Sequence, residues 1–164
     1  MNTPPRALRP DSISEYRIEK VRRRVTIALD GGETLEGDVF LQPAARYRHG
    51  PQDPAELFNE PEPFLPLATP GDRSILIAKA QVRSVQFQDE DADTDLGGVA
   101  EAEVEVTFTD GTSTSGALRL ETRADRPRLL DFLNDDHQRF LRLRLPSGPC
   151  LINRSKIAKV RERR

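Results

Sequence analysis

The side chains that most often carry catalysis are few in this sequence. It holds one cysteine, Cys150, and two histidines, His49 and His137. A nucleophilic site needs a serine or cysteine within hydrogen-bond reach of a base that a third group orients. Both histidines stand among turn-forming residues, and Cys150 begins the apolar segment "CLIN". We therefore expect exposed histidines, a small buried cysteine and a protein that is not an enzyme.

Two further segments have residue types that suit ion or phosphate binding. "DFLNDD" (131–136) is rich in carboxylates, and "DGGE" (30–33) contains a glycine pair. Mg²⁺ or Ca²⁺ needs several oxygen ligands that converge on one point, which carboxylates on a helix end do not obviously provide. The glycine pair has no Gly-Lys-Ser/Thr after it and is typical of a hairpin turn. We expect no metal and no cofactor, with Asp131 fixing a helix and Asn134 ending it.

Basic residues are stronger candidates for binding. "RYRH" (46–49) combines charge with an aromatic ring of the kind that stacks on a base. Lysines and arginines bind phosphate where they share one face of the protein. The candidate nucleic-acid or anion-binding residues are Arg46, Tyr47, Arg48, Lys79, Arg123, Arg126, Arg128, Arg154, Lys156 and Lys159.

The formal net charge of −2 hides an uneven distribution along the chain. Residues 1–24 carry 7 basic and 3 acidic side chains, residues 25–118 carry 5 and 18, and residues 119–164 carry 13 and 6. The simplest interpretation is that two units have differently charged solvated surfaces. Head-to-tail self-association and a basic face for an anionic partner are the alternatives.

An internal duplication determines how these residues are positioned. Four segments of the first half recur in the same order in the second half. The paired segments are 25–41 with 104–120, 54–59 with 129–134, 64–67 with 140–143, and 75–87 with 150–162. Each copy alternates apolar and polar residues with the period of a β-strand, as in "VTIAL" and "VEVTF". The sequence therefore predicts two copies of one small all-β unit.

Turn and cap residues define the elements of each unit. "DGGE" and "TDGT" predict hairpin turns, and Gly37 and Gly116 predict a sharp bend or a close backbone approach inside the second strands. Asp53 and Pro54 predict the start of a one- to two-turn helix before a terminal strand–turn–strand. Asn59 and Asn134 fit a left-handed helix exit.

The expected organisation follows from these units. A basic N-terminal segment (1–24), partly disordered, precedes the first unit (25–87). An acidic linker (88–100) leads to the second unit (101–162) and a basic tail (163–164). Residues 12–24 fit either a leading helix or an extension of the first strand. A single cysteine, no secretory-type apolar stretch and no membrane-length apolar run together favour a cytoplasmic protein.

The paired hairpins, the glycine in each second strand and the terminal strand–turn–strand resemble the Sm-like family of five-stranded barrels. The resemblance lies in "VTIALDGGETLEGDVFL" with "ILIAKAQV" and in "VEVTFTDGTSTSGALRL" with "CLINRSKI". "LLDFLN…FLRL…LINRSKI" is similar to a poorly characterised bacterial branch of that family. The resemblance implies an all-β fold of two tandem five-stranded barrels, each with a short helix.

The RNA-base pocket of that family does not carry over. Asp131 and Asn134 resemble its Asp and Asn, but their spacing is one residue short and they lie in an expected helix. The family's Arg-Gly is replaced by Ala78-Lys79 in the first unit and by Asn153-Arg154 in the second. A weaker likeness to cyclic-dinucleotide-binding barrels, from Arg119, Arg123, Asn153 and Ser155, lacks the family's glycine and its later strands.

Two functions therefore remain. The favoured one is a non-enzymatic assembly or scaffold module that binds itself or a protein partner through barrel edge strands and charged faces. The resemblance implies a homo-oligomer, either a dimer or a trimer that forms a pseudo-hexameric ring. The alternative is an RNA-binding regulator of Sm-like type that acts through basic faces. We expect no membrane partner.

Overall fold

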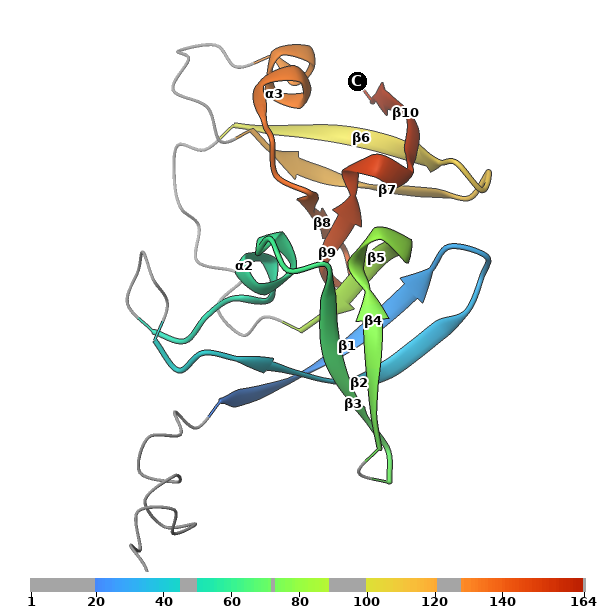
Figure 1. Ribbon diagram of the computed structural model, residues 1–164. Helices are drawn as coiled ribbons and strands as arrows, with labels where there is room; N and C mark the ends of the chain where they lie inside the picture. The colour runs from blue at the N-terminus through green and yellow to red at the C-terminus, as the bar shows by residue number, and fades with distance from the viewer. Residues whose placement is uncertain (1–19, 45–49, 72, 89–99, 121–127, 164) are drawn as a thin grey trace, which may run out of the picture.

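The computed structural model describes residues 20–44, 50–71, 73–88, 100–120 and 128–163. Figure 1 shows strands throughout this part of the chain, with a short helix beside each half of the sheet. None of the helices among the described residues is long and apolar enough to span a membrane. The structure is therefore mostly β, as the alternating pattern predicts.

The same elements occur twice in the same order. The first set is β1 (Val21–Leu29), β2 (Thr34–Leu41), α2 (Pro54–Asn59), β3 (Phe64–Thr69), β4 (Arg73–Ala78), the 3-10 turn η2 (Lys79–Gln81) and β5 (Val82–Phe87). The second set is β6 (Glu101–Phe108), β7 (Ser113–Arg119), α3 (Leu129–Asp135), β8 (Phe140–Leu145), β9 (Gly148–Asn153), the 3-10 turn η3 (Arg154–Lys156) and β10 (Ile157–Glu162). Strand β1 begins at Val21, so residues 21–24 extend the first strand.

The described strands form one ten-stranded sheet in which every pairing is antiparallel. Its order is β10-β6-β7-β8-β9-β5-β1-β2-β3-β4. The two sets meet where β5 pairs with β9, and the sheet is not closed. The strand pairing thus confirms an all-β fold but does not establish two five-stranded barrels.

Glycines shape the strands and turns where the sequence predicts. Gly31, Gly32 and Gly111 have positive φ of 96°, 99° and 89° in the β1–β2 and β6–β7 hairpins. Glycine adopts this conformation without the steric penalty of a Cβ atom. Gly37 and Gly116 serve a different purpose, because a Cβ there would lie 2.5 Å from the Ala68 oxygen and 2.7 Å from the Arg144 oxygen, respectively.

The short helices begin as predicted but end differently. The Asp53 carboxylate accepts a hydrogen bond from the Ala55 amide at 2.6 Å, which caps α2. The left-handed exit expected at Asn59 is wrong, because Asn59 is the last helical residue and Glu60 continues in extended conformation at φ −63°. Helix α3 likewise includes Asn134 and is followed by the extended Asp136. The Asn59 side chain is instead used to contact the other half.

Two hydrophobic clusters fill the interior of the described structure. One contains Val25, Ile27, Val39 and their neighbours from the first half, and the other contains Val104, Val106, Cys150 and their neighbours from the second. Phe140 and Leu151 belong to the second half in sequence but to the first cluster in space. Burial raises the pKa of the Cys150 thiol to about 12, as suits a core cysteine. His137 is exposed, and His49 lies outside the described residues.

Candidate assembly interface

The pairing of β5 with β9 joins the two halves through the backbone. Its register places Ser84 opposite Ile152, Val85 opposite Leu151, and Gln86 opposite Cys150. Strands β5 and β9 are therefore not edges of the sheet. The same type of contact is available to any strand that presents an unpaired edge.

Asn153 connects the two halves just beyond the end of this ladder. Its side chain is fully buried, and its amide donates hydrogen bonds to the Val82 oxygen at 2.7 Å and the Lys79 oxygen at 3.3 Å. Its Oδ1 accepts from the Ser155 amide at 3.1 Å and the Ser155 hydroxyl at 2.9 Å. One side chain thus starts η3 in the second half and satisfies carbonyls of the first half.

Apolar side chains of the second half complete the core of the first. The rings of Phe58 and Phe140 meet edge to face with centroids 5.3 Å apart. The Asn59 side chain accepts a hydrogen bond from the Phe140 amide at 2.8 Å and donates one to the Phe140 oxygen at 3.3 Å. Leu151 lies in the same cluster, opposite Val85. The first half therefore has a receiving face, formed by α2 and β5.

Among the described residues, three ion pairs also cross the junction. Arg142 contacts Asp53 at 2.8 Å, Arg83 contacts Asp110 at 2.6 Å, and Lys156 contacts Asp30 at 2.9 Å. Hydrogen bonds from Thr112 and Arg83 lower the pKa of Asp110 to about 2. Because each pair joins residues that are far apart in sequence, these charges align the halves along the sheet.

The two ends of the sheet are strands β4 and β10. Within the described residues β4 pairs with β3 alone and β10 pairs with β6 alone. Figure 1 shows β10 and β4 toward opposite ends of the molecule, with α3 near β10. The end at β4 carries two exposed large apolar side chains, Phe64 at 57% and Leu76 at 72% exposure.

The exposed pair has buried equivalents in the second half. We call residues at matching positions of the two repeats repeat counterparts. Phe140, the counterpart of Phe64, is 1% exposed, and Leu151, the counterpart of Leu76, is 0% exposed. The difference arises because Phe140 and Leu151 are covered by the receiving face of the first half. Phe64 and Leu76 have no such cover from the described residues.

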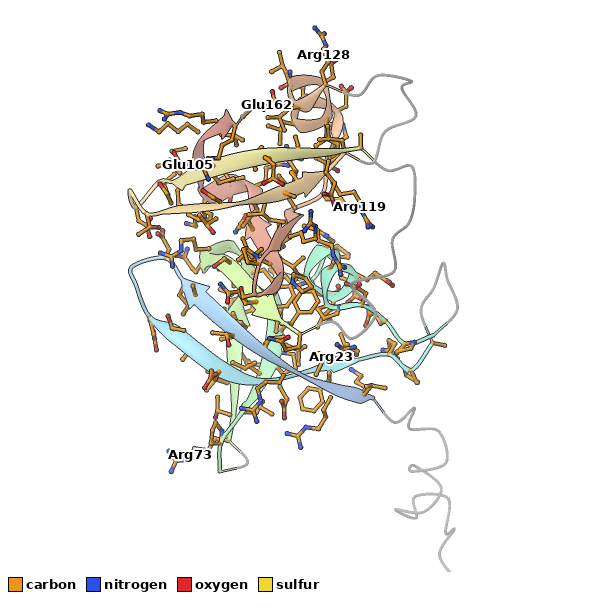
Figure 2. All side chains as sticks on the ribbon, turned by 180° about the vertical axis from the view of Figure 1, so that it is seen from behind. Arg23, Arg73, Glu105, Arg119, Arg128 and Glu162 are labelled. Atoms are coloured by element: carbon orange, nitrogen blue, oxygen red, sulfur yellow. The ribbon has the colours of Figure 1, made fainter. Side chains whose placement is uncertain are left out.

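The structure describes five of the ten candidate nucleic-acid or anion-binding residues, namely Lys79, Arg128, Arg154, Lys156 and Lys159. Figure 2 shows Arg128 at the end of the molecule that carries α3 and β10. Arg128 pairs with Asp131 at 2.8 Å, and Lys156 is held by Asp30. Lys159 is exposed on β10. Arg46, Tyr47, Arg48, Arg123 and Arg126 lie outside the described residues.

Lys79 and its repeat counterpart Arg154 both bind helix-end carbonyls. The buried Lys79 ammonium donates to the Leu57 oxygen at 3.1 Å and the Glu60 oxygen at 3.0 Å. Burial lowers the pKa of Lys79, and the nearby Glu60 carboxylate opposes that shift. Arg154 donates to the Leu133 oxygen at 2.6 Å. These cations therefore stabilise α2 and α3 from within each repeat.

Replacing Lys79 by methionine is expected to lower the free energy of unfolding by about 2 kcal/mol, because the carbonyls of Leu57 and Glu60 lose their charged donor. Urea unfolding followed by circular dichroism measures this change. Lys159→Met, at an exposed lysine, is the control and is expected to change stability by less than ~0.5 kcal/mol. Equal effects of the two substitutions would show that the contacts of Lys79 with the end of α2 contribute nothing to the free energy of unfolding.

Sequence reasoning missed the residues that join the halves. The sequence predicts a helix exit at Asn59 and assigns no contact between the halves to Asn153. One signal was present for the apolar contacts: "CLI" (150–152) in β9 is a continuous hydrophobic run, which is typical of a strand buried on both faces. A strand with one face exposed to solvent would instead alternate apolar and polar residues.

Comparison with protein-family models, with curated proteins and with solved structures finds no match for this chain. The proposed function therefore rests on the junction, on the two sheet ends and on the resemblance seen in the sequence.

Proposed function

We propose that this protein is a non-enzymatic assembly module that joins protein chains by adding strands to the free ends of its sheet. The observation that supports it is the β5–β9 junction, which shows that the fold of one repeat accepts the edge of the other. Among the described residues, β4 and β10 each pair on one side only, so the other side of each strand presents unpaired backbone N–H and C=O groups. Such edges bind strands of a second chain in many proteins.

The resemblance to Sm-like barrels supports the same proposal, since barrels of that family join through edge strands. In this interpretation each repeat is a five-stranded barrel that is completed by its neighbours. A dimer, or a trimer that presents six repeats in a ring, is the expected assembly. A contact between two different edges closes into a ring or continues as a filament, depending on the rotation between neighbours.

Amide hydrogen exchange over a concentration series tests the proposal. Assembly through the edges is expected to slow exchange in β4 (Arg73–Ala78) and β10 (Ile157–Glu162) as the chain concentration rises, in step with the mass measured by sedimentation. Strand β1, which is already paired on both sides, is the internal control. Slowed exchange elsewhere with no slowing in β4 and β10, or no change at any concentration, would contradict edge-strand assembly of this chain.

RNA binding is a second candidate, supported by the three exposed basic residues Lys159, Arg161 and Arg163 at alternate positions of β10 and the residue after it. Alternate residues of a strand point to one face, so their charges add there. Filter binding with mixed RNA at several salt concentrations measures this activity. Binding that weakens steeply with salt would support it, since counterion release sets that slope.

A further inference from the structure

We infer that the surface formed by Phe64 and Leu76 docks onto α3 and β10 of a second copy of this chain, head to tail. This inference rests on the proposed assembly function and specifies its partner and its contact. Phe64 and Leu76 lie on neighbouring strands β3 and β4, at one end of the sheet. Among the described residues of the first half, they are the most exposed large apolar side chains.

Strand alternation explains why Leu76 faces away from its own core. Ile77 is buried in the first cluster and Ile75 packs against it, so the intervening Leu76 points to the opposite face. In the second half, Cys150 and Ile152 enter the second cluster while Leu151 enters the first cluster across the junction. Strand β9 is therefore buried on both faces, and β4 has the same pattern with one face uncovered.

The second half carries a counterpart of the receiving face. Phe58 and Val85 receive Phe140 and Leu151, and their repeat counterparts are Leu133 and Val160. Leu133 and Val160 are half-buried at the margin of the second cluster. The occupant that fits Phe64 and Leu76 is thus the α3–β10 face of another copy, because it reproduces a contact that this fold already makes.

The repeat also predicts the register of the contact. Transferring the β5–β9 register places Val160 of one copy opposite Leu76 of the other. Asn134 is the counterpart of Asn59, which binds both backbone groups of Phe140, and it is exposed. In the proposed contact Asn134 binds the backbone of Phe64 in the second copy.

Apart from the Asn59 contact, the polar links of the internal junction are not reproduced between copies. Asn153 corresponds to Ala78, and the Arg142–Asp53 pair corresponds to Pro66 and Arg128. The Arg83–Asp110 pair corresponds to the uncharged residues Ala158 and Gly31. The Lys156–Asp30 pair corresponds to the uncharged residues Gln81 and Thr109. The contact between copies therefore depends on apolar burial and backbone pairing, so it is reversible and is not weakened by added salt.

Loss-of-contact variants test the surface. Phe64→Ser with Leu76→Ser is expected to raise the dissociation constant at least ~30-fold in sedimentation equilibrium, because two apolar side chains lose their buried site. Since both side chains are exposed, the urea midpoint of unfolding at low concentration stays close to that of the parent. Val21→Ser, at another exposed apolar residue, is the control and leaves association unchanged.

A gain-of-contact variant tests the register of the contact between copies, independently of any loss of folding stability. Ala78→Asn restores the amide that Asn153 supplies internally, aimed at the Arg154 and Ile157 oxygens of the second copy. We expect it to tighten association about tenfold. An unchanged or weaker association of Ala78→Asn would overturn the register.

Disulfide capture tests the head-to-tail orientation of the two copies. With Cys150 replaced by alanine, chains carrying Leu76→Cys are mixed with chains carrying Val160→Cys and oxidised. Head-to-tail docking gives the mixed disulfide dimer. Leu76→Cys dimers alone would overturn the inference while leaving edge-strand assembly intact, and a chain that stays monomeric at every concentration would overturn both.

Discussion

Replacing Asn153 by aspartate is expected to destabilise the protein by about 4 kcal/mol, one of the largest effects of any single substitution at the junction. The buried amide donates to the Lys79 and Val82 oxygens, and an ionised carboxylate would face both oxygens without a proton to share. Urea unfolding at neutral pH, followed by circular dichroism, measures the loss.

Asn153→Ala is the matched control for this result. Alanine also removes the donor, and its expected loss of about 2 kcal/mol does not depend on pH through a titratable group. As the pH falls toward ~4, the loss of stability in Asn153→Asp becomes smaller relative to the loss in Asn153→Ala, because a protonated carboxyl can again donate one hydrogen bond. An aspartate variant that is as stable as the parent at pH 7 would show that Asn153 does not couple the halves.

Replacing Gly116 by alanine is expected to lower the free energy of unfolding by about 3 kcal/mol. The new methyl group would lie 2.7 Å from the Arg144 oxygen and 2.9 Å from Leu143 Cγ, so the backbones of β7 and β8 must separate. Gly37→Ala has the same expected effect in the first half, where the Ala68 oxygen is 2.5 Å away. Thermal or urea unfolding measures both.

Gly111→Asn is the control for steric crowding. No atom lies within 4 Å of a Cβ at this position, and asparagine tolerates its positive φ of 89°. The expected loss is under ~1 kcal/mol. Equal losses at Gly111 and Gly116 would mean that glycine acts through backbone freedom and not through the close approach of β7 to β8.

The order of the elements was predictable because it depends on local patterns. Alternation in "VTIAL" and "VEVTF" predicts β1 and β6, the glycines of "DGGE" and "TDGT" predict the hairpins, and Asp53 with Pro54 predicts the start of α2. These signals depend on residues that are close in sequence. The duplication strengthened them, since each half independently predicts the same series.

The exits of the helices were not predictable on the same grounds. A left-handed end suits Asn59 locally, but its side chain gains two hydrogen bonds to Phe140, which lies far along the chain. Lys79 is likewise a candidate for phosphate binding because it is basic. Its ammonium instead donates to two carbonyl oxygens inside its own repeat. In both cases a tertiary contact determined the role.

The sequence by itself determined that the chain is two copies of one β unit, because hydrophobic periodicity and turn residues act within each copy. Only the tertiary structure decided that β5 pairs with β9 and that Phe140 and Leu151 fill the core of the other half. The physical reason is that an edge strand carries the same pattern whether it is paired or free. Its partner is selected by packing between segments that the sequence places far apart.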